Sequence, residues 1–226
     1  MFFWDPTFIL LIPAMILALY AQNKVKSTFA AMSRVRTRRG ISGAEVAHSI
    51  LSSNGLSHVT VESQPGHLTD HYDPRSKRVR LSEQVYAGRS VAALGVAAHE
   101  VGHALQDKAG FYPMRIRHGL LGPAQLGSTL AWPLALVGLI FGNPRLLDIG
   151  ILLFSGVVLF HVITLPVELD ASKRALRHLA STGILNESEL PGARKVLNAA
   201  ALTYLAAAAV AVMNLIRLLI LREARD

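Results

Sequence analysis

The chain has 226 residues, a formal net charge of +8 and no cysteine, which excludes a disulfide scaffold, a thiolate zinc finger and a Cys nucleophile. Hydrophobic residues make up 51% of it and charged residues only 17%. A soluble domain carries about 25% charged residues. This composition excludes a disordered chain and indicates that much of the sequence lies in an apolar environment.

Four stretches of the sequence lack Asp, Glu, Lys and Arg. They are residues 6–23, 118–144, 149–167 and 196–216. A bilayer core takes about 20 mainly apolar residues per helix, whereas buried helices of soluble proteins are shorter and carry a polar face. We therefore predict four transmembrane helices, of which the last could instead lie in the membrane interface.

The first uncharged stretch could be a signal peptide, but no basic residue precedes it. Basic residues follow it instead, with no acid among them: Lys24, Lys26, Arg34, Arg36, Arg38 and Arg39. This pattern predicts a retained helix with its N-terminus outside the cell membrane and with residues 24–117 in the cytoplasm. Arg34–Arg39 carry no interleaved aromatics, so we expect no nucleic-acid partner and take the lipid bilayer as the partner of this segment.

The polar segment between the first two spans is predicted to mix helices and strands. Residues 44–51 have helical spacing, 58–62 and 77–81 alternate like strands, and a long helix should run from about Ser90 to Gly110. The predicted organisation is a first span (1–23), a cytoplasmic subdomain (24–117), a transmembrane hairpin turning at Gly142-Asn143-Pro144 (118–167), a cytoplasmic segment (168–198) and a last span with the tail (199–226).

The long helix contains His99-Glu100-Val101-Gly102-His103. Histidines at i and i+4 lie on one face of a helix, so both imidazoles can reach one metal ion. Glu100 follows the first histidine and is placed to act as general base toward a water molecule. This H-E-x-x-H arrangement is typical of zinc peptidases, so we predict Zn²⁺ held by His99 and His103 with Glu100 catalytic.

A catalytic zinc site takes three protein ligands and keeps one position open. Glu168 is the candidate for the third ligand, because the predicted hairpin of spans returns the chain to the side of the membrane that it left. A carboxylate at a membrane border is otherwise costly. The alternative is an ordinary helix-end carboxylate that faces lipid headgroups.

Three blocks of the sequence together carry a family resemblance: HLTDHYDPRSKRVRLSEQVY, VAAHEVGHALQ and LPVELDASKRAL. In this order they resemble the YugP-like membrane zinc metallopeptidases, and more distantly the HtpX and CAAX prenyl-protease group. The resemblance implies a mainly α integral-membrane fold, with about four transmembrane helices and a small α+β zincin-like subdomain. It supports Glu168 as a ligand but leaves the role of Asp170 open. In the wider group an Asp follows the ligand Glu by four positions, whereas in this chain that position is Ser172 and Asp170 follows Glu168 by two.

The implied reaction is hydrolysis of a peptide or protein substrate, with the active site facing the cytoplasm of a multi-pass inner-membrane protein. Candidates for residues that support a ligand or stabilise the oxyanion are Asp170, Tyr112, His118, Arg174 and His178. Asp70 and His71 are candidates for the cleft, whereas His71 could equally be a loop residue. Peptidases of this kind resemble one another in binding the substrate as an added strand at the edge of a sheet. We expect residues 77–81 to form that edge strand. The alternative is that this strand is only structural.

Two other functions remain open from the sequence. The protein could be an intramembrane protease, although Arg89, Asp107 and Lys108 flank the H-E-x-x-H helix and disfavour deep burial. It could also be an inactive scaffold with a structural zinc, which the intact Glu100 disfavours. His161 lies within a predicted span, where an ionisable group marks function by default. The sequence does not indicate an oligomeric state.

Overall fold

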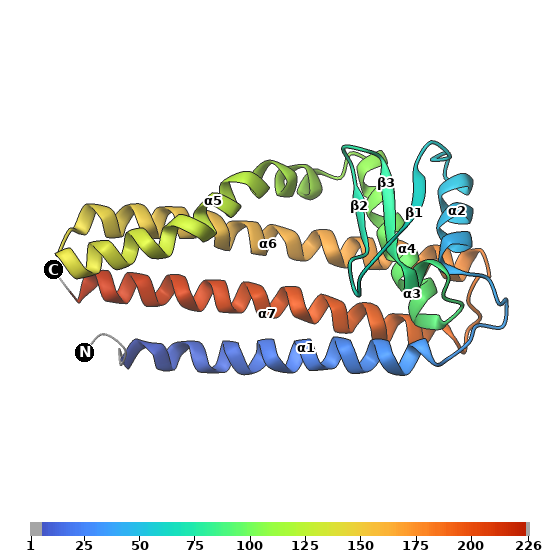
Figure 1. Ribbon diagram of the computed structural model, residues 1–226, viewed down its shortest axis with the longest axis horizontal. Coiled ribbons are helices and arrows are strands. Elements are labelled where there is room, and N and C mark those ends of the chain that lie inside the picture. The colour runs from blue at the N-terminus through green and yellow to red at the C-terminus, as the bar shows by residue number, and fades with distance from the viewer. Residues whose placement is uncertain (1–5, 225–226) are drawn as a thin grey trace. The chain divides into compact units, whose positions relative to one another are not determined.

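The computed structural model describes residues 6–224 (Figure 1). The chain forms two compact units, which are described separately. One unit takes in the chain up to Gln22, Tyr112–Pro166 and the chain from Leu202; the other takes in Asn23–Phe111 and Val167–Ala201. Long helices pass from one unit into the other, so each unit is built from segments that are far apart in the sequence.

The first unit consists of apolar helix segments. Among residues 6–224, four helical stretches are long and apolar enough to cross a membrane, as predicted. They are Pro6–Ser33 (the 3₁₀ turn η1, Pro6–Leu10, with α1, Leu11–Ser33), α5 (Tyr112–Phe141), α6 (Pro144–Ser181) and α7 (Leu190–Glu223). The last stretch is a continuous helix of the required length. The mainly α membrane fold class is therefore confirmed.

Small residues bring α5 and α6 into close contact in this unit. A Cβ on Gly138 would lie 2.7 Å from the backbone nitrogen of Leu147, and one on Gly150 would lie 2.8 Å from the carbonyl oxygen of Ala131. Helices in membranes associate through such small residues because lipid gives no hydrophobic driving force between helices. The turn at Gly142 and Asn143 follows the prediction, with Gly142 at φ +64°.

The second unit holds the mixed subdomain. Its elements are α2 (Gly43–Ser53), β1 (Thr60–Gln64), β2 (His71–Asp73), β3 (Arg78–Ser82), α3 (Glu83–Tyr86) and α4 (Val91–Lys108). Ser42 caps α2 and forms a capping box with Glu45, and the Ser90 side chain caps α4. Helix α2 packs on α4 through apolar side chains that are almost fully buried, as are the inward side chains of β3.

The sheet corrects one expectation. Its order is β1-β3-β2, with β3 parallel to β1 and antiparallel to β2. The strand expected at 77–81 to be an edge is therefore central: Val79 is paired with Val61 on one side and Tyr72 on the other. The short strand β2 was not predicted, because three residues give too little alternation to be recognised.

Candidate metal centre

Three predicted ligands meet in the second unit. His99 and His103 lie on α4 and Glu168 lies on α6. The Nε2 atoms of His99 and His103 are 3.2 Å and 3.5 Å from Oε2 of Glu168. All three ligand atoms lie within 4.8 Å of one another, and Glu168 is only 2% exposed. Within residues 6–224 this is the one group of His and acidic side chains whose geometry could hold a metal ion.

The spacing of these atoms fits a zinc ion. Zinc lies about 2.0–2.2 Å from His nitrogen and carboxylate oxygen in tetrahedral sites, so two ligand atoms are about 3.3 Å apart. The two nitrogen–oxygen distances match that edge length. The His₂Glu set is also one of the donor sets of catalytic zinc, which leaves a fourth position for water or substrate.

Gly102 sets how closely α4 approaches α6. A Cβ at Gly102 would lie 2.6 Å from the carbonyl oxygen of Ala171, which is backbone and cannot move aside. Glycine therefore lets the two helix backbones touch between the two histidines. This contact brings Glu168 and Ser172, which flank Ala171 on α6, within reach of both imidazoles.

The second nitrogen of each imidazole also has a partner. Nδ1 of His99 lies 3.1 Å from Oγ of Ser172, and Nδ1 of His103 lies 3.0 Å from Oε1 of Gln106. A histidine ligand is oriented in this way when its other nitrogen bonds to an oxygen, which leaves Nε2 for the metal. Ser172 occupies the position where the wider group has Asp.

Gln106 connects His103 to Asp170. Its Nε2 donates to the carbonyl oxygen of Val167 at 2.8 Å and to Oδ2 of Asp170 at 2.9 Å. Because both of these partners are acceptors, the amide orientation is settled and Oε1 accepts from Nδ1–H of His103. Asp170 also accepts from Nε of Arg174 at 2.6 Å. Asp170 thus acts on the histidine through a fully buried glutamine rather than directly.

Glu100 lies on α4 directly after His99 and is 8% exposed. A carboxylate this buried is costly unless it has partners or a function.

Arg174 lies on α6, where its guanidinium carbon is 5.8 Å from the centre of the Phe111 ring and its Nε is bonded to Asp170. Arg174 therefore supports Asp170 in this structure.

Of the remaining oxyanion candidates, only His178 is placed relative to the cluster. His178 lies ten residues beyond Glu168 on α6, which is about 15 Å along the helix axis. Tyr112 and His118 are in the first turns of α5 and belong to the first unit. They remain predictions from the sequence.

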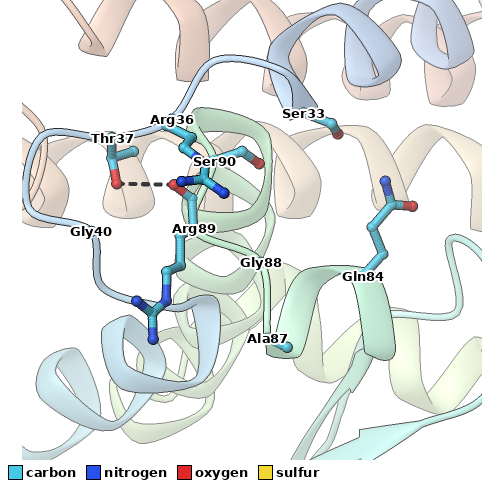
Figure 2. Close-up of a pocket in the computed structure, with 9 residues that line it drawn as sticks. All are labelled: Ser33, Arg36, Thr37, Gly40, Gln84, Ala87, Gly88, Arg89 and Ser90. Carbon is cyan, nitrogen blue, oxygen red and sulfur yellow. Dashed lines mark hydrogen bonds between the residues drawn. The ribbon is translucent and has the colours of Figure 1, made fainter.

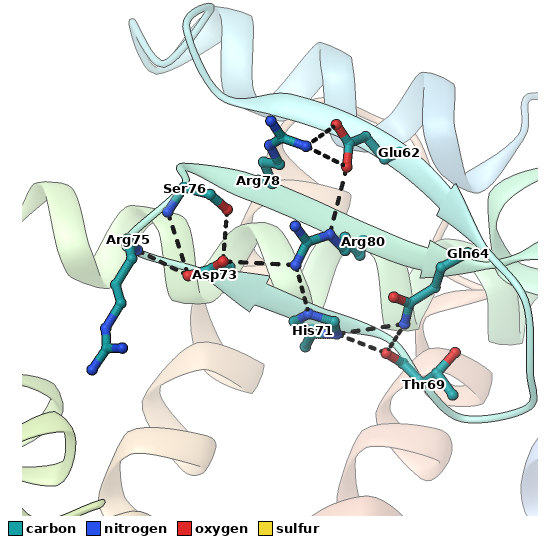
Figure 3. Close-up of polar contacts among 9 residues, drawn as sticks. All are labelled: Glu62, Gln64, Thr69, His71, Asp73, Arg75, Ser76, Arg78 and Arg80. Atoms are coloured by element: carbon teal, nitrogen blue, oxygen red, sulfur yellow. Dashed lines mark hydrogen bonds and ion pairs between the residues drawn. The ribbon is translucent and has the colours of Figure 1, made fainter. Parts of the chain in front are cut away.

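Asp70 and His71 both bond to groups of the sheet, and Figure 3 shows His71 beside Arg80 and Gln64. Asp70 accepts from the backbone N–H of Ser82 at 2.8 Å, and burial raises the pKa of its carboxyl although these hydrogen bonds oppose the shift. His71 opens β2, and its Nδ1 lies 2.8 Å from the carbonyl oxygen of Thr69 while Nε2 faces Arg80 at 3.4 Å. His71 is thus a strand residue, which corrects the loop alternative, and neither side chain joins the metal cluster.

Gly102 and Gln106 were not among the site residues predicted from the sequence. Both lie on the metal-binding helix, at positions +3 and +7 from His99, and therefore on the same side of that helix. The signal in the sequence is a single glutamine three residues after His103, on the face of the helix that carries both histidines. Its partner on α6 could not have been inferred from local spacing.

Replacing Gln106 with leucine should weaken zinc binding by about 10–100-fold, the usual effect of losing a partner that orients a ligand. Leucine keeps the volume but leaves His103 Nδ1 and Asp170 without their bridge. The dissociation constant of zinc, measured by competition with a chromogenic chelator, tests this. Gln84→Leu, at an exposed position on α3, is the control. Equal affinities in the two variants would contradict the bridging role.

Comparisons with known proteins agree with the metal centre. Residues 7–223 match the family described as "Putative neutral zinc metallopeptidase". The chain is also 47% identical over 218 residues to the "Putative membrane protease YugP" of Bacillus subtilis (strain 168), an alignment that covers 96% of this chain and 97% of that protein. No solved structure matches the chain significantly.

Proposed function

The chain belongs to the neutral zinc metallopeptidase family, and on that premise we propose that it is an integral-membrane zinc endopeptidase that cleaves membrane or membrane-proximal proteins. One observation carries the proposal: His99, His103 and Glu168 place their ligand atoms within 4.8 Å of one another, next to the buried Glu100. A structural zinc site would need no such carboxylate beside its ligands.

Each residue has a distinct task in the proposed hydrolysis. The ion would be held by Nε2 of His99, Nε2 of His103 and a carboxylate oxygen of Glu168, and when bound it would act as a Lewis acid. The Glu100 carboxylate accepts a proton from the attacking water and delivers it to the leaving amine nitrogen. Ser172 and Gln106 keep the two imidazoles in the orientation that this task requires.

Strand β2 is the proposed site for the substrate main chain. Within residues 6–224 it pairs on one side only, with β3, so its other edge can accept an extended peptide. Tyr72 on β2 fixes the strand to the metal-binding helix, because its hydroxyl donates to Oδ2 of Asp107 at 2.7 Å. Burial and this hydrogen bond raise the pKa of Tyr72, so the phenol stays a donor at every physiological pH.

Removal of zinc tests the function directly. Purified protein treated with dipicolinate should lose its cleavage of a fluorogenic peptide, and one equivalent of Zn²⁺ should restore it. Mg²⁺ should fail, because it prefers all-oxygen, octahedral coordination. A serine-protease inhibitor is the control and should have no effect. Zinc binding without any cleavage of a broad peptide library would instead assign a scaffold function.

The orientation in the membrane can be tested because the chain has no cysteine of its own. We propose that the metal centre faces the cytoplasm. The basic segment after α1 is predicted to be cytoplasmic, and it belongs to the same compact unit as the metal centre. Arg75→Cys and Arg145→Cys replace two exposed arginines, one in the turn between β2 and β3 and one in the first turn of α6. In spheroplasts a membrane-impermeant maleimide should label only Arg145→Cys. Labelling of both, or of Arg75→Cys alone, would refute this topology.

A further inference from the structure

A second polar pocket lies in the same unit as the metal centre (Figure 2). It has a volume of about 580 Å³, within the range of small-molecule sites. It is formed by the end of α1 and the segment that follows it, together with α3 and the loop that precedes α4. Its lining includes Ser33, Arg36, Thr37, Gln84, Arg89 and Ser90.

The two walls of this pocket are held together by main-chain hydrogen bonds. Thr37 N–H and its hydroxyl both donate to the carbonyl oxygen of Arg89, at 3.0 Å and 3.1 Å. Val91 N–H donates to the carbonyl oxygen of Val35 at 2.9 Å. Arg36 and Arg89 are therefore presented from a preformed frame, which lowers the entropy cost of binding a ligand.

The arginines around this pocket differ from three other arginines of the same unit. Arg78 and Arg80 in the sheet, and Arg174 beside the metal centre, each form an ion pair with a carboxylate. Within residues 6–224, neither Arg36 nor Arg89 has a carboxylate at ion-pair distance. The same holds for three further exposed arginines of the segment after α1, namely Arg34, Arg38 and Arg39.

Two acids close to these arginines, Glu45 and Glu189, accept hydrogen bonds from other groups. The Glu45 carboxylate accepts from the N–H and hydroxyl of Ser42, and it acts on Arg89 only as a more distant charge. The Glu189 carboxylate accepts from the backbone N–H groups of Arg38 and Asn186. Neither carboxylate therefore forms a direct ion pair with the guanidinium of Arg36 or Arg89.

The remaining lining groups suit an anion with several oxygens. Gln84 and Ser33 contribute an amide and a hydroxyl, and Ser33 Oγ is the one buried side-chain polar atom of residues 6–224 that has no hydrogen-bond partner. Arginine guanidinium groups bind phosphate through paired N–H···O contacts. The pocket lining contains no carboxylate that would repel such a group.

The length of the first helical stretch indicates where this anion comes from. Pro6–Ser33 has 28 residues, which span about 44 Å when the 3₁₀ turn is included. A bilayer with both headgroup layers is about 40–45 Å thick. The sequence predicts that the uncharged residues 6–23 fill the hydrocarbon core, so residues 24–33 continue about 15 Å past it and bring Ser33, which lines the pocket, close to the cytoplasmic surface of the headgroup layer.

We propose that this pocket binds the phosphate group of an anionic phospholipid, with Arg36 and Arg89 as the recognition residues. The bound lipid anchors the segment after α1, and through the main-chain bonds to Arg89 and Val91 it anchors the start of the metal-binding helix. The site is separate from the metal centre and does not depend on the proposed peptidase function.

Lipid titration of the full-length protein tests this site. Native mass spectrometry in detergent should show phosphatidylglycerol binding in preference to phosphatidylcholine. Arg36→Gln and Arg89→Gln should each weaken phosphatidylglycerol binding about fivefold, the effect of one basic residue at an anionic membrane surface. Arg39→Gln is the matched control, since Arg39 is exposed in the same basic segment but does not line the pocket. Zinc content should be unchanged in all three variants.

The outcomes separate the alternatives. Equal weakening by Arg36→Gln and Arg39→Gln would mean diffuse attraction to a charged surface and would overturn the pocket assignment. Equal binding of the two lipids would overturn it as well. Displacement of the lipid by millimolar inorganic phosphate, lost in Arg36→Gln, would reassign the site to a soluble phosphate and overturn the lipid proposal. If Arg36→Gln fails to fold, Arg89→Gln gives the same test from the opposite wall.

Discussion

Glu100→Gln is expected to lower peptidase activity by about 100-fold or more while zinc stays bound. General-base catalysis contributes about 10²–10⁴-fold, and glutamine keeps the shape of the side chain but cannot accept the proton. The side chain is 8% exposed, so an isosteric replacement avoids the cavity that alanine would leave. The ligand atoms belong to other residues, which is why zinc should be retained.

Two measurements on one preparation check this expectation: the initial rate of cleavage of a fluorogenic peptide, and zinc content by mass spectrometry of the purified protein. Glu83→Gln, an exposed glutamate on α3, is the matched control and should retain the wild-type rate. If Glu100→Gln cleaves at a rate near that of the control, the general base lies elsewhere. Loss of zinc in Glu100→Gln would instead mean that Glu100 helps to hold the metal.

Glu168→Ala is expected to lose zinc during purification and to lose activity with it. Its carboxylate lies 3.2 Å and 3.5 Å from the two Nε2 atoms, so its removal leaves only two protein ligands. Loss of a group that merely orients a ligand costs about 10–100-fold in affinity, and loss of a ligand should cost more. Glu168→Gln keeps the volume of this buried side chain and separates loss of the ligand from loss of packing.

The control variants rank the neighbouring residues. Asp170→Ala should weaken zinc binding less than Glu168→Ala, because Asp170 reaches His103 only through Gln106. His161→Ala should retain zinc, since His161 belongs to the apolar first unit. Zinc stoichiometry after dialysis gives the ranking, with circular dichroism to verify folding. Full occupancy in Glu168→Ala together with loss in Asp170→Ala would make Asp170 the third ligand.

Local patterns were sufficient to predict several elements. The helix that carries His99 and His103 begins after its Ser90 cap and ends before Gly110, as its spacing and caps indicate. The four apolar helices follow from uncharged length alone. These features depend on residues at most one or two turns apart, or on composition, so they can be read from neighbouring positions.

Other features depended on the packing of distant segments. His99 and Glu168 are 69 positions apart, and the sequence offered Glu168 as a ligand only through an assumed hairpin and a family resemblance. The contact is made because Gly102 lets α4 touch α6 at Ala171, a steric condition that no local pattern expresses. The same contact places Ser172 on His99 and Gln106 on Asp170.

The order of the sheet was decided in the same way. The alternation of residues 77–81 correctly indicated a strand, but a strand's own sequence does not state whether one or two neighbours pair with it. Two apolar positions of β3, Val79 and Leu81, are fully buried, and pairing with both β1 and β2 satisfies its backbone groups. The sequence by itself therefore determined the membrane helices, the metal-binding helix and its two histidines. Only the tertiary structure decided which side chains complete the metal centre and which strands lie at the edges of the sheet, because both depend on contacts between segments that are distant in the chain.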